Sequence, residues 1–402
     1  MKILCFSSDS TGCHYYRVKQ PFNALNRLNV TYNPTIFIPS TMFGEKLPQL
    51  YEFIAQYDLV VLQRCFEYSV AKIIRQACDL LGKRMVFDTD DDCFHVAEDN
   101  PSYNAVMNEH VQSTYPDILR MADAVTVTTK ELRDVVYPYN RNVYVFPNNV
   151  DSIFCGEQGE PKRDLLEERL NEQGMATIAN EHGVVGIPAY RNIKEAHSTS
   201  TKKERIIRIG YTATPSHLSD YNTVARSIDK VCEKYGTKVW LVIIGAKEIY
   251  ERTKTGRKRS AYIETTSNIQ QYFWHLRNID IGIAPLVKNL FNMSKSPLKA
   301  LEYGMWGTPA ILPNYVTYAR EFTNHKNCLM YNNTGEFEDA LCELIENDAF
   351  RLKLGMAARD HVAKNRLESD PNNYEPRHAL YKALVNDSRK LVTRTRKDEQ
   401  NV

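Results

Sequence analysis

A segment near residue 300 combines two lysines and a glutamate at spacings that suit an anionic ligand. Lys295, Lys299 and Glu302 share one face if the segment is helical, and Ser296 followed by Pro297 is typical of a helix start. Two ammonium groups beside a helix N-terminus can bind phosphates, and a deeper carboxylate can bind a ribose diol. The pattern predicts a nucleoside-diphosphate site. The alternative is an exposed helix with an ordinary Lys–Glu pair, which the apolar flanking residues disfavour.

A second candidate segment is GYTATPSHLSD at 210–220, which follows a predicted strand. Gly210, Thr212 and Thr214 suit a loop that turns backbone N–H groups and hydroxyls toward a diphosphate, and the next helix adds its positive end. His217 and Asp220 are three residues apart, so each can orient the other. We expect His217 to contact the same ligand, although such a histidine is more often a capping or packing residue.

The segment SSDSTGCHYYR at 7–17 follows the first predicted strand. Gly12 allows a close backbone approach to a ligand, and the next helix would direct its N-terminus at an anion. His14 and Arg17 are three residues apart on one predicted helix face and could meet a phosphate or a sugar hydroxyl. The alternative for Arg17 is an ion pair with a neighbouring carboxylate. There is no G-x-G-x-x-G motif, so a dinucleotide cofactor is disfavoured.

Four aspartates crowd the end of another predicted strand, in the sequence DTDDD. These are Asp88, Asp90, Asp91 and Asp92, and Arg64 at the end of the preceding strand could supply their counter-charge. Such crowding costs charge repulsion, which a cation or bound hydroxyls would relieve. The cluster is therefore a candidate D-x-D metal site, or a site that binds acceptor hydroxyls or acts as a general base. The alternative is a solvated acidic turn that caps the next helix.

The composition limits the class of protein. The chain has 402 residues, of which 43% are hydrophobic and 25% charged, with a net charge of +2. These values indicate a folded protein of two or three domains and argue against nucleic-acid binding over its whole surface. Nine cysteines without a C-x-x-C pair predict reduced thiols and no structural metal. A short apolar N-terminus and no long apolar run predict a cytoplasmic protein without a membrane span.

The candidate segments lie on an alternating pattern of strands and helices. Apolar runs separated by amphipathic stretches are typical of parallel sheets covered by helices, so we predict an α/β fold with two Rossmann-like domains facing a central cleft. The predicted strands are 2–8, 30–38, 58–64, 84–90, 124–129, 142–148, 206–211, 239–245, 279–286, 308–313 and 328–331. We expect domains at 1–155 and 206–370, a charged insertion at 156–205 and a C-terminal helix within 371–402. Ligands of such sheets bind at the carboxyl ends of strands, where all four segments fall.

The chain resembles retaining GT-B glycosyltransferases of the large group that includes sucrose and glycogen synthases, within it a branch common in bacteria and their phages. The resemblance rests on YRVKQP, DTDDD, ADAVTVTT, VFPNNVD, RIGYTATPSH and FNMSKSPLKALEYGMWGTPAI, and it spans about 1–155 and 205–365. It implies a sugar nucleotide bound mainly by the second domain, an acceptor bound by the first, and a C-terminal helix that crosses back to the first domain. It also implies no cofactor and no required metal ion, and a host-cytoplasmic location if a phage encodes the protein.

The resemblance assigns roles to particular residues. Glu302 aligns with the glutamate that binds the ribose, whereas the first glutamate of the E-x7-E pair is replaced by Ser294. The group's Arg and Lys after the first strand of the second domain are missing from GYTATPSH, so Lys295 or Lys299 would replace them. We expect His14, Asp90 and Asp91 to act at the reaction centre, Gly12, Arg17, Gly210, Thr212, Thr214, His217, Lys295, Ser296, Lys299 and Glu302 to bind the donor, and Arg64, Asp88 and Asp92 to bind the acceptor.

The expected acceptor class rests on two basic runs and on the lack of a membrane-directed apolar patch in the sequence. Residues 247–259 hold six basic and two acidic side chains, and residues 377–397 are also rich in Lys and Arg. These runs favour DNA with hydroxymethylated bases as the acceptor, as for phage glycosyltransferases, although a charge run is usually a solvated face. A cell-envelope or capsule glycan is the alternative acceptor. A third possibility is a non-catalytic protein that binds a nucleotide sugar, which the loss of the first glutamate favours and the Lys295, Lys299 and Glu302 face disfavours.

Overall fold

The computed structural model describes residues 1–8, 12–36, 47–152, 179–180, 183–184, 206–253, 260–264 and 269–399. Most of the predicted insertion at 156–205 and the basic residues 254–259 lie outside this range, as do the side chains beyond residue 387. Two short strands of the insertion, β7 (Ala179–Asn180) and β8 (Gly183–Val184), are described; they pair with each other, and β7 pairs with β11 (Ser260–Glu264).

The N-terminal half is built on a six-stranded parallel sheet of order β2-β1-β3-β4-β5-β6. Its strands are β1 (Lys2–Ser7), β2 (Thr31–Ile36), β3 (Leu59–Gln63), β4 (Arg84–Asp88), β5 (Ala124–Val127) and β6 (Val143–Val145). All six predicted strands of this half are confirmed. The side chains of β1, β3, β4 and β5 are almost all buried, as apolar strands covered on both faces should be.

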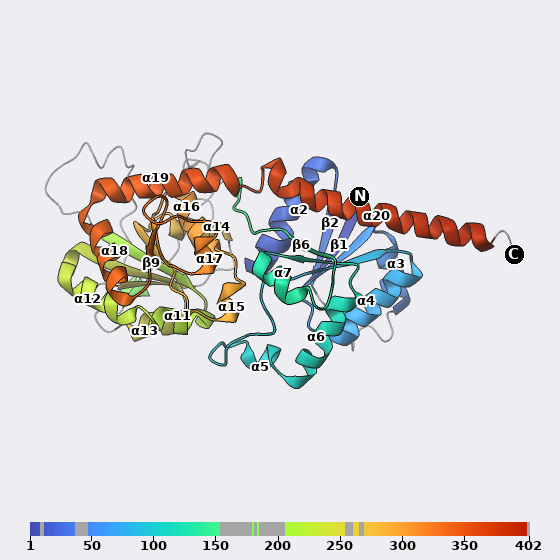
Figure 1. Ribbon diagram of the computed structural model, residues 1–402, viewed down its shortest axis with the longest axis horizontal. Helices are drawn as coiled ribbons and strands as arrows, with labels where there is room; N and C mark the ends of the chain where they lie inside the picture. Colours follow the sequence, from blue (N-terminus) through green and yellow to red (C-terminus); the bar gives the residue numbers. More distant parts are fainter. Residues whose placement is uncertain are drawn as a thin grey trace.

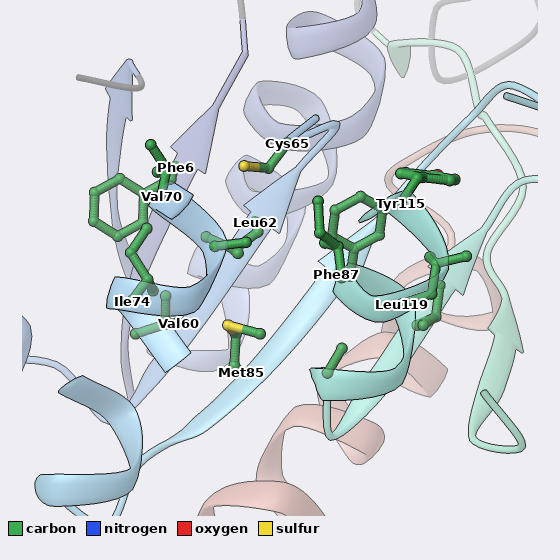
Figure 2. Close-up of a cluster of buried hydrophobic side chains, with 14 of the residues drawn as sticks. Phe6, Val60, Leu62, Cys65, Val70, Ile74, Met85, Phe87, Tyr115 and Leu119 are labelled. Carbon is green, nitrogen blue, oxygen red and sulfur yellow. The ribbon is translucent and has the colours of Figure 1, made fainter. Parts of the chain in front are cut away.

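Helices cover both faces of this sheet. One face packs on α3 (Leu47–Ala55), α4 (Tyr68–Leu80), α6 (Glu109–Met121) and α7 (Lys130–Val136), around the core that includes Phe87, Tyr115 and Ile74 (Figure 2). The other face packs on the segment from α1 (Gly12–His14) through the π-helix η1 (Tyr15–Lys19) to α2 (Gln20–Leu25), and on α20 (Pro371–Glu399). Helix α5 (Tyr103–Val106) precedes α6.

The C-terminal half is built on a second sheet, of order β14-β13-β12-β9-β10-β11-β7-β8. The six parallel strands are β9 (Ile207–Ala213), β10 (Val239–Gly245), β11, β12 (Ile281–Ile283), β13 (Ala310–Pro313) and β14 (Leu329–Tyr331). Strand β11 was not predicted, because SAYIE offers too short an apolar run to stand out. Helices α11 (Leu218–Asn222), α12 (Ala225–Tyr235), α13 (Lys247–Arg252) and α18 (Thr334–Glu346) pack on one face, and α14 (Ile269–Leu276), α16 (Leu298–Met305) and α17 (Val316–Ala319) on the other.

The chain crosses between the halves twice, at adjacent places. Helix α19 (Asp348–Asn365) lies along the C-terminal half and leads into α20, which runs along the N-terminal half (Figure 1). At the crossing, the Val150 N–H donates to the Arg366 carbonyl at 2.8 Å, and the Glu368 N–H donates to the Val150 carbonyl at 3.0 Å. Tyr381 and Val385 of α20 are buried against the first sheet, so the C-terminal helix belongs structurally to the N-terminal half.

Two local details differ from the prediction. Helix α16 begins at Leu298 and no side chain caps it, so Ser296 is not its N-cap. Residues Tyr15–Lys19 form a π-helix, in which the spacing of three residues no longer aligns side chains as in an α-helix. The later start of α16 leaves Lys295 outside the helix. The π-helix means that His14 and Arg17 do not share a helix face as predicted.

Candidate active site

Three side chains of the C-terminal half form a continuous hydrogen-bonded chain. The Asp220 carboxylate lies 2.7 Å from Nδ1 of His217, and Nε2 of His217 lies 2.9 Å from Nζ of Lys299. His217 comes from the turn after β9, Asp220 from α11 and Lys299 from the first turn of α16. The predicted pairing of His217 with Asp220 is confirmed, and the structure extends it to a lysine 82 residues away.

Burial and neighbouring charges perturb all three groups. Burial, with the nearby ammonium groups of Lys299 and Lys295, lowers the pKa of His217 to about 3. Burial and the like charge of Lys295 lower the pKa of Lys299 to about 8. Burial alone would raise the pKa of Asp220, but the hydrogen bond with His217 and the charge of Lys295 hold that pKa below its ordinary value. The repulsion between the two ammonium groups, which lowers the pKa of Lys299, would be relieved by an added anion.

Glu302 lies one turn deeper on α16 and is buried, with 3% of its surface exposed. Its Oε1 accepts a hydrogen bond from the Tyr16 hydroxyl and its Oε2 from the Tyr272 hydroxyl, each at 2.7 Å. Burial raises the pKa of Glu302, although both tyrosine hydrogen bonds oppose the shift. The carboxylate is thus held by two hydroxyl donors, one from each half of the molecule.

The halves also interlock through apolar side chains beside this carboxylate. Tyr15 and Tyr16 of the N-terminal half are buried in the core around α14 and α16, and Phe291 of the C-terminal half is buried in the core of the first sheet. The Thr129 hydroxyl donates to the Ser294 carbonyl at 2.7 Å, across the same boundary. Ser294, at the position where the resemblance predicts a glutamate, is fully buried.

The remaining predicted donor residues of this half divide into two groups. Gly210 and Thr212 lie within β9 rather than in a loop, and a side chain at Gly210 would overlap Ile279, so this glycine serves close packing. The Gly210 carbonyl accepts a hydrogen bond from the Tyr303 hydroxyl at 3.1 Å. Thr214 is exposed after β9, with its hydroxyl 2.7 Å from that of Ser216. Of the predicted donor residues in this segment, only Thr214 and His217 therefore lie beyond the end of β9.

Lys295 and Ser296 precede α16 and are partly exposed. The Lys295 ammonium lies 4.6 Å from the centre of the Phe291 ring, and its charge acts on His217, Asp220 and Lys299. Lys295 thus joins the predicted site by its position in the loop, not by sharing a helix face with Lys299.

Arg17 and Asp88 form an internal ion pair. The Arg17 guanidinium donates to both carboxylate oxygens of Asp88, at 2.9 and 2.7 Å, and also to the Phe146 carbonyl and the Asn148 side chain. Thr126 donates a further hydrogen bond to Asp88 at 2.6 Å. Both charged side chains are 1% exposed. The expectations that Arg17 binds the donor and Asp88 the acceptor are therefore wrong, because neither side chain reaches the surface.

Asp92 is also a structural residue. Its Oδ1 accepts a hydrogen bond from the Phe94 N–H at 3.0 Å, its Oδ2 lies 2.8 Å from Nδ1 of His95, and it is 1% exposed. The expectation that Asp92 binds the acceptor is wrong, and the alternative of a solvated turn that caps the next helix does not describe Asp92 either, because the side chain is buried and bonds within its own turn. Gly12 is exposed at the start of α1, and Nδ1 of His14 lies 2.9 Å from the Ser7 hydroxyl.

Asp90 and Asp91 are the two aspartates of the cluster that pair with Arg64, and Asp91 also lies near the opposite half. Arg64 lies 3.6 Å from a carboxylate oxygen of each, which confirms its role as their counter-charge. Burial raises the pKa of Asp90, and the charge of Asp91 adds to this effect. Asp91 is close enough to Lys299 for its charge to raise the lysine pKa. Arg64 has a φ of 54°, a costly conformation for a side-chain-bearing residue that often marks functional sites.

A cavity of about 180 Å³ lies between the two halves, next to Asp220 and Lys295. Its lining includes Asp99 and Asn100 from the N-terminal half and Asp220, Asn292 and Lys295 from the C-terminal half. The Ser219 hydroxyl donates to Asp99 across it. Sequence reasoning found Lys295 and Asp220 but missed Asp99, Asn100 and Asn292, because isolated Asn and Asp residues form no recognisable pattern. Amide, hydroxyl and carboxylate groups together suit a ligand rich in hydroxyls.

The residues that the structure describes contain no group of three His, Cys, Asp or Glu side chains placed to hold a metal ion. Within the same ranges, no helix is both long and apolar enough to span a membrane.

No protein-family model and no curated protein sequence matches the chain. Solved structures do. The chain is similar to HepE of Anabaena in complex with UDP and glucose, at 10% identity and a TM-score of 0.61, over 94% of this chain and 99% of that one. It is also similar to a glycosyltransferase of Rickettsia africae (10% identity, TM-score 0.59, 96% and 98% covered) and to a sucrose-phosphate synthase of Thermosynechococcus elongatus (13%, 0.57, 99% and 100%). These similarities show that the fold is GT-B.

Proposed function

We propose that the protein is a glycosyltransferase that moves a sugar from a nucleoside-diphosphate donor to an acceptor hydroxyl. One observation carries the proposal: Lys299, Lys295 and Glu302 meet at the boundary of the halves, opposite Asp91. The fold supports it, since HepE was solved with UDP and with UDP-glucose in a similar structure. A nucleotide sugar needs cations for its diphosphate and a carboxylate for its ribose, and this site supplies both.

The donor would lie along α16. The Lys299 and Lys295 ammonium groups would bind the diphosphate, and Glu302 would accept hydrogen bonds from the ribose hydroxyls in place of those from Tyr16 and Tyr272. Each tyrosine hydroxyl donates to one carboxylate oxygen of Glu302, as a ribose hydroxyl would in the donor complex. The sugar would then point toward the cavity that Asn100 and Asn292 line.

The transfer would proceed with retention, through an oxocarbenium-like state. The bond from the anomeric carbon to the diphosphate oxygen breaks, and the acceptor oxygen bonds to the same carbon from the same face. The acceptor proton passes to the departing diphosphate oxygen, so no enzyme nucleophile is required. Lys299 and Lys295 stabilise the negative charge that develops on the leaving group. Asp90, Asp91 and His14 are the groups proposed to contact the acceptor or the transferred sugar.

We propose a hydroxymethylated base in DNA as the acceptor. Five of the seven basic residues of 377–397 follow Asp387 in the sequence, and the end of α20 extends beyond the first sheet (Figure 1). Arg377 is an exception, because it is buried and lies 3.7 Å from Asp88, so it is unavailable to a polyanion. An envelope or capsule glycan is the competing acceptor.

The test is a transfer assay with UDP-, GDP- and TDP-sugars against two acceptor sets: hydroxymethyl-containing duplex DNA and a glycan panel. We expect nucleoside diphosphate release with one donor and a matching mass increase on the DNA. A mass increase on a glycan alone would overturn the DNA acceptor and keep the transferase. Donor binding without release on any acceptor would identify a nucleotide-sugar-binding protein instead. The Lys299→Met variant is the matched control, since it should lose release with either acceptor set.

A further inference from the structure

We propose that His217 and Asp220 are positioning residues for Lys299: the imidazole fixes the ammonium against the diphosphate, and the carboxylate fixes the tautomer of the imidazole. This inference rests on the proposed function, and it assigns to His217 a role other than contact with the donor. His217, Asp220 and Lys299 would together form the phosphate site in place of the Arg and Lys that related enzymes are expected to carry after the first strand of this half.

The hydrogen-bond geometry allows only one arrangement of protons. An ammonium has three donors and no acceptor, so Nε2 of His217 must accept from Lys299 across 2.9 Å. A neutral imidazole that accepts at Nε2 carries its proton on Nδ1, and that proton points at the Asp220 carboxylate across 2.7 Å. The lowered pKa of His217 is consistent with a ring that stays neutral. His217 therefore cannot serve as a general base while Lys299 is charged.

Asp220 is itself held rigidly. Its other oxygen, Oδ1, accepts hydrogen bonds from the Val287 N–H at 2.7 Å and from the Asn292 side-chain amide at 3.1 Å. The Asn292 amide also donates to the Val287 carbonyl at 2.9 Å, which ties the loop after β12 to α15 (Leu290–Met293). The carboxylate is 4% exposed. A buried, fully bonded aspartate of this kind is suited to orienting a histidine.

The chain of contacts restricts Lys299 to one position and leaves two of its three N–H donors for a ligand. The charged groups that act on this ammonium come from every side of the site. Asp220 belongs to α11, Glu302 to the same helix as the lysine, Lys295 to the loop before it and Asp91 to the loop after β4. An unrestrained lysine side chain would lose several rotatable bonds on binding a phosphate, so restraint in advance lowers the entropic cost of binding.

The first experiment measures the dissociation constant of UDP, GDP and TDP by calorimetry for the wild type, His217→Ala and His217→Gln. Removal of the acceptor should weaken binding of the preferred nucleotide roughly tenfold, about the effect of one hydrogen bond to a charged group. Gln offers a carbonyl oxygen to Lys299, so His217→Gln should recover most of the affinity. His110→Gln, on an exposed residue of α6, is the matched control and should bind as the wild type does. Equal affinity of His217→Ala and the wild type would overturn the proposal, and so would equal weakening in Ala and Gln.

The second experiment reads the tautomer directly and needs no ligand. In ¹⁵N-histidine-labelled protein, the His217 ring should be neutral with its proton on Nδ1 at pH 7; its signals are assigned by their loss in His217→Gln. In Asp220→Asn the preference for the Nδ1 tautomer should weaken without reversing, because the Lys299 ammonium still donates to Nε2 while the amide is a weaker acceptor than the carboxylate. The pH above which nucleotide affinity falls should also decrease in this variant, because the Asp220 charge raises the pKa of Lys299. A protonated ring or an Nε2 tautomer in the wild type would overturn the proposal.

The two experiments separate the inference from the proposed function. If the wild type binds none of the nucleotides while the ring shows the Nδ1 tautomer, the proposed donor is wrong and the hydrogen-bonded chain stands. If the wild type binds a nucleotide and the variants bind it equally well, the donor site stands and the positioning role is wrong.

Discussion

Both halves of the molecule gather charged residues at the carboxyl ends of their strands, but they use them differently. In the N-terminal half the charges largely neutralise one another inside the protein, as Arg17 does with Asp88 and Arg64 with Asp90 and Asp91. In the C-terminal half Lys295 and Lys299 act on each other as like charges, and their neighbours Asp220 and Glu302 are occupied by other hydrogen bonds. The C-terminal half thus places two like-charged ammonium groups next to each other, a repulsion that a bound anion would relieve, whereas Arg17 and Asp88 satisfy each other inside the protein.

The largest effect that this comparison predicts is on stability, in the N-terminal half. Arg17→Ala removes the bidentate partner of the buried Asp88 carboxylate and leaves it only Arg377, 3.7 Å away; breaking a buried ion pair costs about 3–5 kcal/mol of unfolding free energy. Urea denaturation measures the loss. Nucleotide affinity of the folded fraction should stay at the wild-type level. A stable Arg17→Ala variant with weak nucleotide binding would reverse the assignment of Arg17 as structural.

Lys299→Met tests the opposite case in the C-terminal half. Loss of an ammonium that stabilises the leaving group should lower kcat/KM of the transfer about 10²- to 10³-fold. The free energy of unfolding should rise slightly, because the variant no longer buries a second positive charge beside Lys295. Steady-state kinetics and urea denaturation give the two values. A variant that loses stability and keeps its activity would place Lys299 with the structural charges.

Glu302→Ala should weaken donor binding by about 1.5–3 kcal/mol, through the loss of charge-assisted hydrogen bonds to the ribose. The matched control is a donor with a 2′,3′-dideoxyribose, which should bind the wild type and Glu302→Ala with similar affinity. Calorimetry with both donors checks the difference. Unchanged affinity for the ordinary donor would remove Glu302 from the pocket.

The pH dependence of donor affinity follows from Lys299, whose pKa is lowered to about 8. The charged ammonium binds the diphosphate, so affinity should be constant on the acidic side of this pKa and fall as pH rises through it, by up to about tenfold per unit. Titrations of a UDP-sugar between pH 6 and pH 10 measure the midpoint. In Lys299→Met this fall in affinity with rising pH should disappear. If the fall persists in the variant, another titrating group causes it.

The smallest expected effect concerns the hydrogen bond that joins the halves at Glu302. Tyr16→Phe removes the hydroxyl that occupies Oε1, and a ribose hydroxyl would no longer need to displace it. We expect donor affinity to increase, by about 0.5–1.5 kcal/mol. Tyr32→Phe is a control of the same chemistry, because its hydroxyl donates only within the N-terminal half, to Asn23. Weaker binding in Tyr16→Phe would show that Tyr16 contacts the donor itself.

The fold could be predicted well from the sequence because its signals are local. All eleven predicted strands are confirmed, since buried parallel strands have continuous apolar runs. Helix α3 and strand β11 were missed, because neither LPQLYEFIA nor SAYIE has flanking signals that distinguish it. The start of α16 was placed too early because Ser296 and Pro297 resemble a cap that the backbone does not form.

The site could be predicted only where side chains act near their own position in the sequence. His217, Lys295, Lys299 and Glu302 do meet, but the contact of Glu302 with Tyr16 spans 286 residues and left no trace in the pattern. The aspartate cluster shows the same limit. In the sequence, the four neighbouring carboxylates are chemically alike. Only the tertiary structure buries Asp88 and Asp92 and brings Asp91 close to Lys299.

The paired crossing at Val150 and Glu368 has a mechanical consequence. Two backbones that run side by side and share hydrogen bonds resist torsion far more than a single linker would. Ser152 and Glu368 strengthen the same point, because the serine N–H and hydroxyl both donate to the carboxylate. We therefore expect any relative motion of the halves to bend this bridge rather than twist it, and such a bend would change the separation of Asp91 and Lys299.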